Sequence, residues 1–168
     1  MSVNVNNLRG IPRPKDISLL TEEMFPVLVQ PLLTGLRVHI VKDGDSVFIR
    51  RWNGEAVSKK DFEDIAFEVW DMAEPQEAIF DGVIVGGKFK VMDILSYEGE
   101  WLCDKPLSER REHLSKCQFG EHTEVVLSRE VAALEDLENV EVGVVKPLSS
   151  TYIPDCDATI DWFVYRTE

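Results

Sequence analysis

Residues 91–111 read VMDILSYEGEWLCDKPLSERR, and they combine a strand with the start of a helix. The apolar run that ends at Leu95 is typical of a buried strand, which we expect over residues 88–95. Pro106 suits the first turn of a helix, because the amide hydrogen that proline lacks would have no partner there. The sequence therefore predicts a helix from Pro106 to about Lys116, with the Gly99-Glu100 pair between the two elements.

Two hairpins and a further helix are expected before this stretch. Strands over residues 36–41 and 46–52 flank Asp43-Gly44, and a strand over residues 78–85 is joined to the strand over 88–95 at Gly86-Gly87. Such pairs of residues are typical of tight β-turns. A pattern that resembles a capping box begins at Ser58, and apolar residues at helical spacing predict a helix over residues 62–73.

Strands also outnumber helices after residue 111. The remaining expected elements are a strand over residues 123–128, a short helix over 129–137, and strands over 139–146 and 158–166. Because most strands have a neighbour in sequence with which to pair, the fold class is α+β with a largely antiparallel sheet. Residues 1–24 contain Pro12 and Pro14 and show no sustained periodicity, so we expect an N-terminal arm over 1–24 and one folded domain over 25–168.

Acidic residues are concentrated in the later two thirds of the chain. Of 168 residues, 18 are Lys or Arg and 31 are Asp or Glu, which gives a net charge of −13. Residues 1–60 hold nine basic and six acidic residues, a net of +3, and residues 61–168 hold nine and 25, a net of −16. Because Lys and Arg supply most of the affinity for nucleic acids, this balance disfavours broad DNA binding.

The composition is that of a folded protein in a reducing compartment. A chain of this length buries roughly 68–70% of its unfolded surface, so it needs neither a metal nor a disulfide to stabilise a core. Its three cysteines form no CxxC pair, and an odd count favours reduced thiols. No apolar run approaches the ~18 residues of a membrane span, and the first ten residues lack the apolar run of a signal peptide. We therefore expect a cytoplasmic protein that does not associate with membranes.

The order of short motifs resembles the nucleotidyltransferase domain of ATP-dependent DNA ligases, a group that also contains RNA ligases and mRNA capping enzymes. Residues 91–95, 99–100 and 104–111 are similar to the FDIL, GE and kPLxeRR motifs of that family. Further similarities follow in order between residues 25 and 166: Gln30-Pro31, Gly35, Arg37, Asp81-Gly82, Glu141, Lys146, Ser150, Tyr152, Trp162 and Arg166. The resemblance implies a DNA-ligase-like nucleotidyltransferase (ATP-grasp-like) fold with antiparallel sheets and flanking helices. Because the chain ends at the last motif, we expect no OB-fold domain.

The departures from the family pattern fall on the residues that carry its chemistry. In the family, the lysine of a K-x-D-G motif attacks ATP to form lysine-AMP, but Leu32 and Thr34 stand at the lysine and the aspartate. Val83 replaces the ribose-binding glutamate of the D-G-E motif, and Val164 replaces a phosphate-contacting lysine of the W-x-K-x-K motif. Leucine has no lone pair with which to attack phosphorus. The resemblance therefore implies that no catalytic residue remains.

A vestigial nucleotide site would use the residues that still match the family. The resemblance assigns nucleotide contact to Arg37 and purine packing to Met92, which stands at an aromatic position. It assigns metal binding to Glu141, and phosphate binding to Lys146 and Arg166. Each also has a structural interpretation: Arg37 would pair with an acid, and Glu141 and Lys146 would pair with each other.

Neither a metal site nor a relocated nucleophile is expected. The potential zinc ligands match no common spacing: Cys103, His113, Cys117 and His122. Asp93 lacks the two further acids that a metal would need nearby. Use of Lys42 or Lys90 as a nucleophile would require a rebuilt site.

The sequence therefore predicts a catalytically inactive DNA-ligase-like adenylation domain that serves as a protein-binding or structural component in DNA replication or repair. Its partner would be a replication or repair enzyme, contacted by the acidic surface through a basic patch or through mimicry of DNA. We expect no cofactor, and weak or no DNA binding. The alternative is a nucleotide- or DNA-binding module that uses the old cleft, with ATP and Mg²⁺ as cofactors. A third hypothesis is an active nucleotidyltransferase with a relocated lysine.

Overall fold

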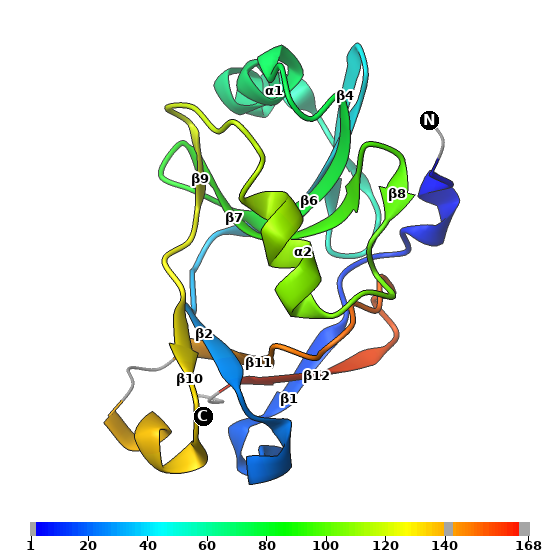
Figure 1. Ribbon diagram of the computed structural model, residues 1–168. Coiled ribbons are helices and arrows are strands. Elements are labelled where there is room, and N and C mark those ends of the chain that lie inside the picture. Colours follow the sequence, from blue (N-terminus) through cyan, green and yellow to red (C-terminus); the bar gives the residue numbers. More distant parts are fainter. Residues whose placement is uncertain (1–2, 140–142, 165–168) are drawn as a thin grey trace.

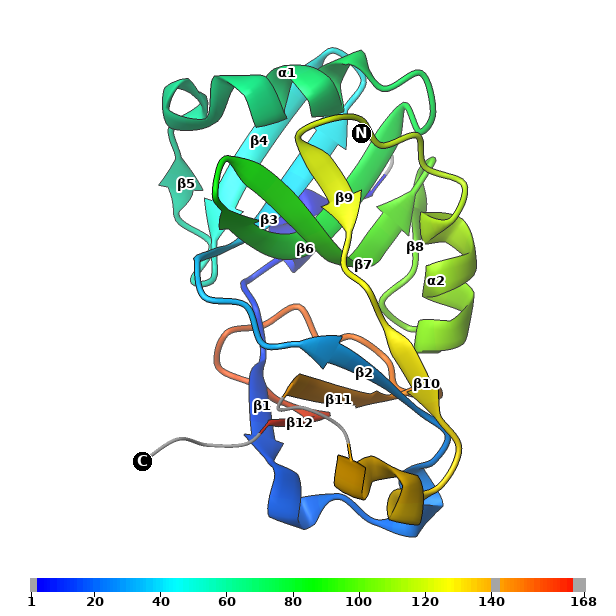
Figure 2. The same ribbon diagram turned by 90° about the vertical axis from the view of Figure 1, so that its left-hand side faces the viewer.

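Two β-sheets lie one above the other in the computed structural model, which describes residues 3–139 and 143–164 (Figures 1 and 2). The seven-stranded sheet has the order β5-β4-β3-β6-β7-β8, with β9 also paired to β7, and the five-stranded sheet has the order β1-β12-β11-β2-β10. Neither strand order closes into a barrel within these residues. Among them, no helix is long and apolar enough to cross a bilayer.

The elements have the following bounds. The larger sheet contains β3 (Leu36–Asp43), β4 (Ser46–Arg51), β5 (Ala56–Val57), β6 (Glu77–Val85), β7 (Lys88–Tyr97), β8 (Glu100–Trp101) and β9 (Thr123–Val125). The smaller sheet contains β1 (Arg13–Asp16), β2 (Val27–Pro31), β10 (Arg129–Val131), β11 (Gly143–Pro147) and β12 (Thr159–Val164). The helices are α1 (Glu63–Asp71) and α2 (Leu107–Leu114), with 3₁₀ helices at Val5–Asn7, Ile17–Leu19, Glu22–Met24, Lys59–Phe62 and Leu134–Asn139.

Both predicted hairpins are confirmed. Asp43 pairs with Ser46, which leaves Gly44 in the turn with a φ of 56°. Val85 of β6 pairs with Lys88 of β7, and the two glycines between them have φ values of 60° and 76°. A two-residue type I′ turn requires positive φ at both positions, which glycine adopts without a steric penalty.

Both longer predicted helices are also confirmed. The helix predicted over 62–73 is α1, which buries Ile65, Ala66 and Val69 against the larger sheet. The helix predicted over 106–116 is α2, whose buried side chains include Leu107 and Leu114.

The structure differs from the sequence prediction at residues 129–137. Instead of a short helix, this segment contains β10, which pairs antiparallel with β2, and the start of the 3₁₀ helix at Leu134–Asn139. Hydrogen bonding to β2 satisfies the backbone of β10, and such tertiary pairing overrides a weak local helix propensity.

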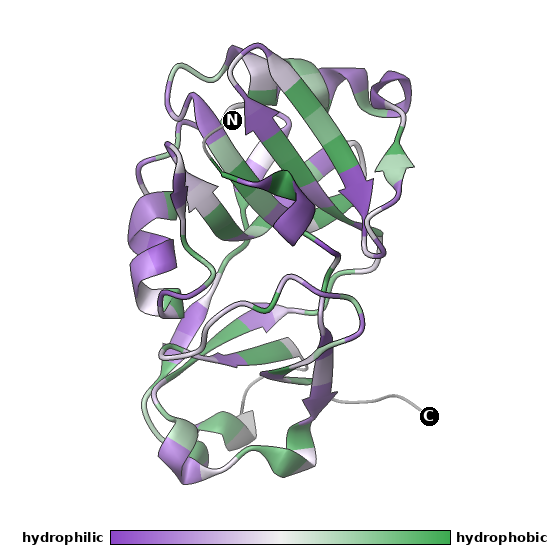
Figure 3. Cartoon of the chain, turned by 90° about the vertical axis from the view of Figure 1, so that its right-hand side faces the viewer, coloured by the Kyte–Doolittle hydropathy of each residue, from purple (hydrophilic) through white to green (hydrophobic). Residues whose placement is uncertain are grey.

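The N-terminal segment packs against the rest of the fold. Strand β1 pairs parallel with β12, near the other end of the chain. Val3 and Leu8 are buried in one cluster with residues of both sheets and of the segments that follow β8 and β11: Val41, Ile79, Leu95, Cys103, Val144, Tyr152, Ile160 and Trp162. Figure 3 shows that hydrophobic residues gather in the strands of both sheets. The two sheets are therefore joined by a shared apolar core, and buried polar side chains lie beside it.

Candidate functional site

A buried ion pair lies on the face of the larger sheet that meets the smaller one. Arg37 of β3 donates two hydrogen bonds to Asp81 of β6, from Nε to Oδ1 at 2.8 Å and from Nη2 to Oδ2 at 2.7 Å. The Asp81 side chain is 0% exposed and that of Arg37 is 30% exposed. Burial by itself raises the pKa of Asp81, but the charge and hydrogen bonds of Arg37 outweigh it and lower that pKa to about 2. Arg37 therefore has the acidic partner that its structural interpretation requires.

Tyr152 and His39 extend this ion pair into a network. The Tyr152 hydroxyl donates to Asp81 Oδ2 at 3.1 Å and lies 2.8 Å from His39 Nε2. Burial raises the pKa of Tyr152, and burial lowers the pKa of His39 to about 4. Because the hydroxyl proton is directed to the carboxylate, the neutral imidazole is left to donate from Nε2 to the hydroxyl oxygen.

A second buried ion pair explains the most specific motif of the sequence. Arg110 of α2 donates from Nε and Nη2 to the two carboxylate oxygens of Asp93 on β7, both at 2.9 Å, and its Nη1 donates to the carbonyl oxygens of Lys105 and Ser150. The side chains of Arg110 and Asp93 are 0% and 1% exposed. Both oxygens of Asp93 are thus occupied by the arginine, so these residues attach α2 to the sheet.

Lys146 of β11 is the most unusual group between the sheets. The residue is 0% exposed, and no atom of the described chain accepts a hydrogen bond from its Nζ. The ammonium lies 4.0 Å from the ring centroid of Trp162, whose Nε1 donates to Ser150 Oγ at 3.1 Å. Burial lowers the pKa of Lys146 from 10.5 to about 7. A lysine in this position is poised between its charged and neutral forms at neutral pH.

Gln30 supplies an unsatisfied acceptor on the same sheet face. Gln30 pairs with Val144 and Lys146 pairs with Leu28 across β2 and β11, so the two polar side chains are diagonal neighbours on one face. Gln30 Nε2 donates to the Met92 carbonyl oxygen at 3.1 Å, and its Oε1 has no hydrogen-bond partner within the described residues. An orphan donor and an orphan acceptor that are close together are the pattern expected of a small polar ligand site or a bound water.

The positions at which this chain departs from the family motifs lie in two different environments. Leu32 follows β2 and is 51% exposed, and Thr34 is also exposed. Val83 and Met92 are buried together with Val126 in a small apolar cluster. A purine could reach Met92 only by displacing this packing.

Three further predicted residues lie near or beyond the end of the described chain. Val164 is half-buried in β12 and pairs with Val144. Glu141 and Arg166 lie outside the described residues, so the predicted metal-binding and second phosphate-binding positions have no described geometry.

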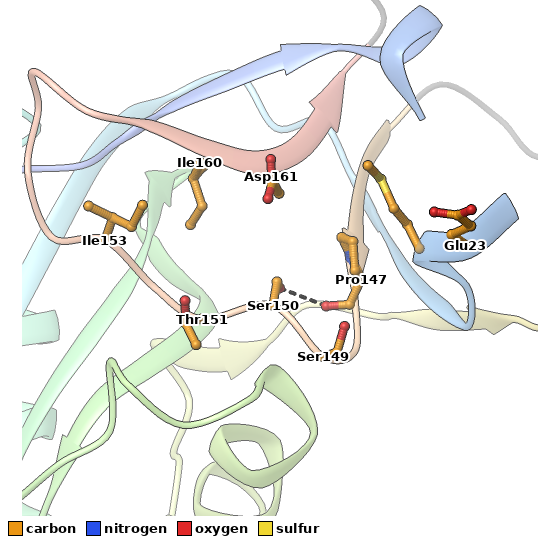
Figure 4. A pocket seen from close by; sticks show the side chains of 9 residues that line it. Glu23, Pro147, Ser149, Ser150, Thr151, Ile153, Ile160 and Asp161 are labelled. Atoms are coloured by element: carbon orange, nitrogen blue, oxygen red, sulfur yellow. Dashed lines mark hydrogen bonds between the residues drawn. The ribbon is translucent and has the colours of Figure 1, made fainter. Parts of the chain in front are cut away.

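A hollow of about 300 Å³ lies where β11 and β12 diverge (Figure 4). The described strand pairs are Val144 with Val164 and Val145 with Phe163, after which Pro147 has no amide hydrogen to continue the ladder. The lining residues are Glu23, Met24, Pro147, Ser149, Ser150, Thr151, Ile153, Ile160 and Asp161. Lys15 already forms an ion pair with Asp161. Since Lys146 does not line this hollow, the hollow gives no route to the buried ammonium.

Comparison with known proteins gives a match in structure. No protein-family model matches the chain, and no curated protein matches it in sequence. The ligase domain of LigD from M. tuberculosis matches with a TM-score of 0.70 and 15% identity, over 96% of this chain and 60% of that one. The chain has the fold of the ligase domain of ATP-dependent DNA ligases.

Two further ligase structures agree with this result. A mycobacterial DNA ligase D complexed with ATP and MES matches the ligase-fold chain with a TM-score of 0.64 and 15% identity, over 93% of this chain and 60% of that one. A structure described as Pmar-Lig matches with a TM-score of 0.65 and 15% identity, over 95% and 46%. The resemblance predicted from the motifs is therefore confirmed as a likeness of fold, and the chain spans at most about 60% of the length of these three proteins.

Only some of the predicted site residues lie among the polar groups that meet between the sheets. Arg37 and Lys146 were predicted and lie there, but His39, Tyr152 and Gln30 were not named as site residues. Tyr152 and Gln30 belong to matched motifs, which could have indicated them. His39 lies in the middle of an apolar strand and offers no comparable signal in sequence.

Proposed function

We propose that this chain is a catalytically inactive ligase-fold domain that serves as a protein-binding component for a DNA replication or repair enzyme. The observation that carries the proposal is the aliphatic side chain of Leu32, half-exposed at the position where the family places its attacking lysine. Without an amine at this position, no bond from nitrogen to the α-phosphorus of ATP can form there. We also expect a cytoplasmic location, where the three free cysteines stay reduced.

Three lysines elsewhere in the chain are not placed to replace the missing nucleophile. Lys146 is fully buried beneath Trp162. Lys42 is 1% exposed and donates to the Met72 carbonyl oxygen, and Lys90 forms an ion pair with Glu124. Each would have to leave its present contacts before it could attack a nucleotide. The retained fold and the acidic surface support the proposed protein-binding role. The choice of a replication or repair enzyme as the partner rests on analogy with the ligases that share this fold.

Incubation with labelled ATP and Mg²⁺, followed by a denaturing gel, tests the loss of activity. We expect no labelled band from the wild-type chain, and none from the triple variant Leu32→Lys, Thr34→Asp, Val83→Glu. That variant still lacks a lysine at Val164, and it should unfold at a lower temperature because a new carboxylate enters the buried cluster around Val83. Thr34→Asp alone is the matched control, since residue 34 is exposed. A wild-type band that disappears on substitution of one lysine would overturn the proposal.

A second candidate function is the binding of a small anionic ligand between the sheets. It is favoured by the unpartnered, fully buried Nζ of Lys146, which can donate hydrogen bonds to an anion. Calorimetric titration with ATP, AMP and pyrophosphate would test it, with Lys146→Met as the variant and exposed Lys59→Met as the control. Saturable binding that Lys146→Met abolishes and Lys59→Met preserves would establish this function. No heat of binding with any of the three ligands would exclude it for them.

A further inference from the structure

The outer face of α1 exposes two large aromatic side chains. Phe67 is 62% exposed and Trp70 is 45% exposed, and their ring centroids lie 5.7 Å apart. Residues three apart share one face of a helix, so the two rings form a continuous apolar surface. Figure 2 shows α1 at the end of the molecule farthest from the five-stranded sheet. The rings therefore lie well away from the site between the sheets.

Three carboxylates surround these rings on the same face. Glu63 and Asp64 lie four and three residues before Phe67, and Asp71 lies four residues after it. All three are exposed, and α1 itself contains no lysine or arginine. We call Glu63, Asp64, Phe67, Trp70 and Asp71 the acidic aromatic face.

The remaining charged neighbours of this face leave it negative. His122 Nε2 lies 3.9 Å from Asp64 Oδ2, and the other ring nitrogen of His122 lies 3.0 Å from Glu68 Oε2. The nearest bases before the helix, Lys59 and Lys60, belong to the 3₁₀ helix that precedes α1. Three carboxylates around two rings thus present a net negative apolar surface.

The chemistry of the acidic aromatic face limits what can cover it. Exposed aromatic pairs of this kind are typical anchors of protein interfaces, where tryptophan is strongly enriched. The carboxylates repel nucleic acids, anionic lipids and an identical face of a second copy. A complementary surface needs an apolar stripe with Lys or Arg on both sides. A basic amphipathic helix of a partner, packed against α1, supplies the apolar stripe and the basic residues together. Its apolar residues recur at three- and four-residue spacing.

We propose that the acidic aromatic face docks a basic amphipathic helix of a partner protein. The inference rests on the proposed protein-binding function and specifies its surface and the chemistry of its partner. Phe67 and Trp70 insert between apolar residues of the partner helix. Glu63, Asp64 and Asp71 attract the flanking Lys and Arg side chains, which raises the association rate and makes it sensitive to salt.

Calorimetric titration with a synthetic helical peptide, built from a leucine stripe flanked by lysines, tests the proposal. We expect saturable binding with one peptide per chain, weakened about tenfold or more by Phe67→Ser with Trp70→Ser. The variant Glu63→Gln, Asp64→Asn, Asp71→Asn should weaken binding at low salt and remove most of its salt dependence. A peptide with glutamate in place of lysine should not bind.

The matched control is a second pair of exposed aromatics that lies beside basic residues. Phe48 and Trp52 are 48% and 51% exposed, and Arg50 and Arg51 are two of the three residues between them. Phe48→Ser with Trp52→Ser should leave peptide affinity unchanged. Unchanged binding in the α1 variant, loss of binding in the Phe48 and Trp52 variant, or no binding at all would overturn the proposal. Circular dichroism confirms that each variant stays folded.

Two further measurements separate the docking proposal from other outcomes. Sedimentation that shows dimers abolished by Phe67→Ser with Trp70→Ser would assign the face to a second copy and overturn the proposal. Lysine-AMP formation together with peptide binding at α1 would overturn the inactive function and leave the docking surface intact. Absence of both would overturn only the docking surface.

Discussion

Replacement of Lys146 by methionine should stabilise the ligase-fold chain, although it removes a residue that matches a family motif. The Lys146 ammonium is fully buried, has no hydrogen-bond acceptor among the described residues, and contacts the Trp162 ring at 4.0 Å. Methionine has a similar length, packs well on aromatic rings and carries no charge to desolvate. The variant therefore keeps the packing and loses the penalty of a buried charge.

The size and pH dependence of the effect follow from the pKa of Lys146, which burial lowers from 10.5 to about 7. This difference corresponds to on the order of 5 kcal/mol, and the lost cation–π contact offsets about 2 kcal/mol. A net gain on the order of 3 kcal/mol is expected at about pH 6. The unfolded lysine keeps its proton up to about pH 10.5, whereas the folded lysine releases it near pH 7. Wild-type stability therefore rises over this window, and the advantage of the variant shrinks.

Urea unfolding at about pH 6 and about pH 9 measures both quantities. Lys59→Met is the control, because Lys59 is exposed and its replacement should change neither the stability nor its pH dependence by much. A Lys146→Met variant that is less stable than wild type at about pH 6 would refute the reasoning. So would a stability difference that does not shrink as the pH rises. Either result would mean that the ammonium has a favourable partner in the folded chain.

Three other substitutions test buried contacts of the fold. Arg110→Met should cost about 3–5 kcal/mol in urea unfolding because it leaves Asp93 buried without a counter-ion, and a cost below about 1 kcal/mol would contradict this. The pKa of Asp81 is about 2 against the usual 3.8, so its contribution of on the order of 2 kcal/mol to stability is full above about pH 3.8 and is lost as the pH falls to about 2. Asp81→Asn should remove this loss of stability at low pH. If the variant loses stability at low pH as the wild type does, the result would argue against the ion pair. Gly82→Ala should lower the thermal midpoint because its Cβ would lie 2.2 Å from the Lys90 carbonyl oxygen, and an unchanged midpoint would contradict this close approach.

The elements that the sequence predicts correctly are those that local chemistry determines. The glycine turns at residues 43–45 and 86–87 need little beyond their own backbone preferences, and α1 and α2 follow from apolar spacing and an opening proline. The helix predicted over residues 129–137 was wrong, because the strand in this segment forms by pairing with β2, which is distant in sequence. In the same way, β1 depends on β12, a partner that no local pattern reveals.

The candidate site could likewise be predicted only in part. The motifs identify Arg37, Asp93 and Arg110, but sequence alone leaves open whether such residues contact a ligand or one another. The structure pairs Arg37 with Asp81 and Asp93 with Arg110. The burial of Lys146 depends on Trp162 and on the contact between two sheets, so its lowered pKa has no signature in the sequence. Phe67 and Trp70 lie off the apolar stripe that predicts α1, but the sequence does not show whether another element covers the two rings.

Intact-mass spectrometry after incubation with ATP and Mg²⁺ shows most directly whether the ligase-fold chain performs the self-adenylation of ATP-dependent DNA ligases. An active ATP-dependent DNA ligase treated in parallel provides the positive control. We predict that the mass of this chain stays that of the unmodified polypeptide, because Leu32 provides no amine at the attacking position. A mass increase equal to one AMP, mapped by peptide sequencing to a lysine, would contradict the proposed inactive function.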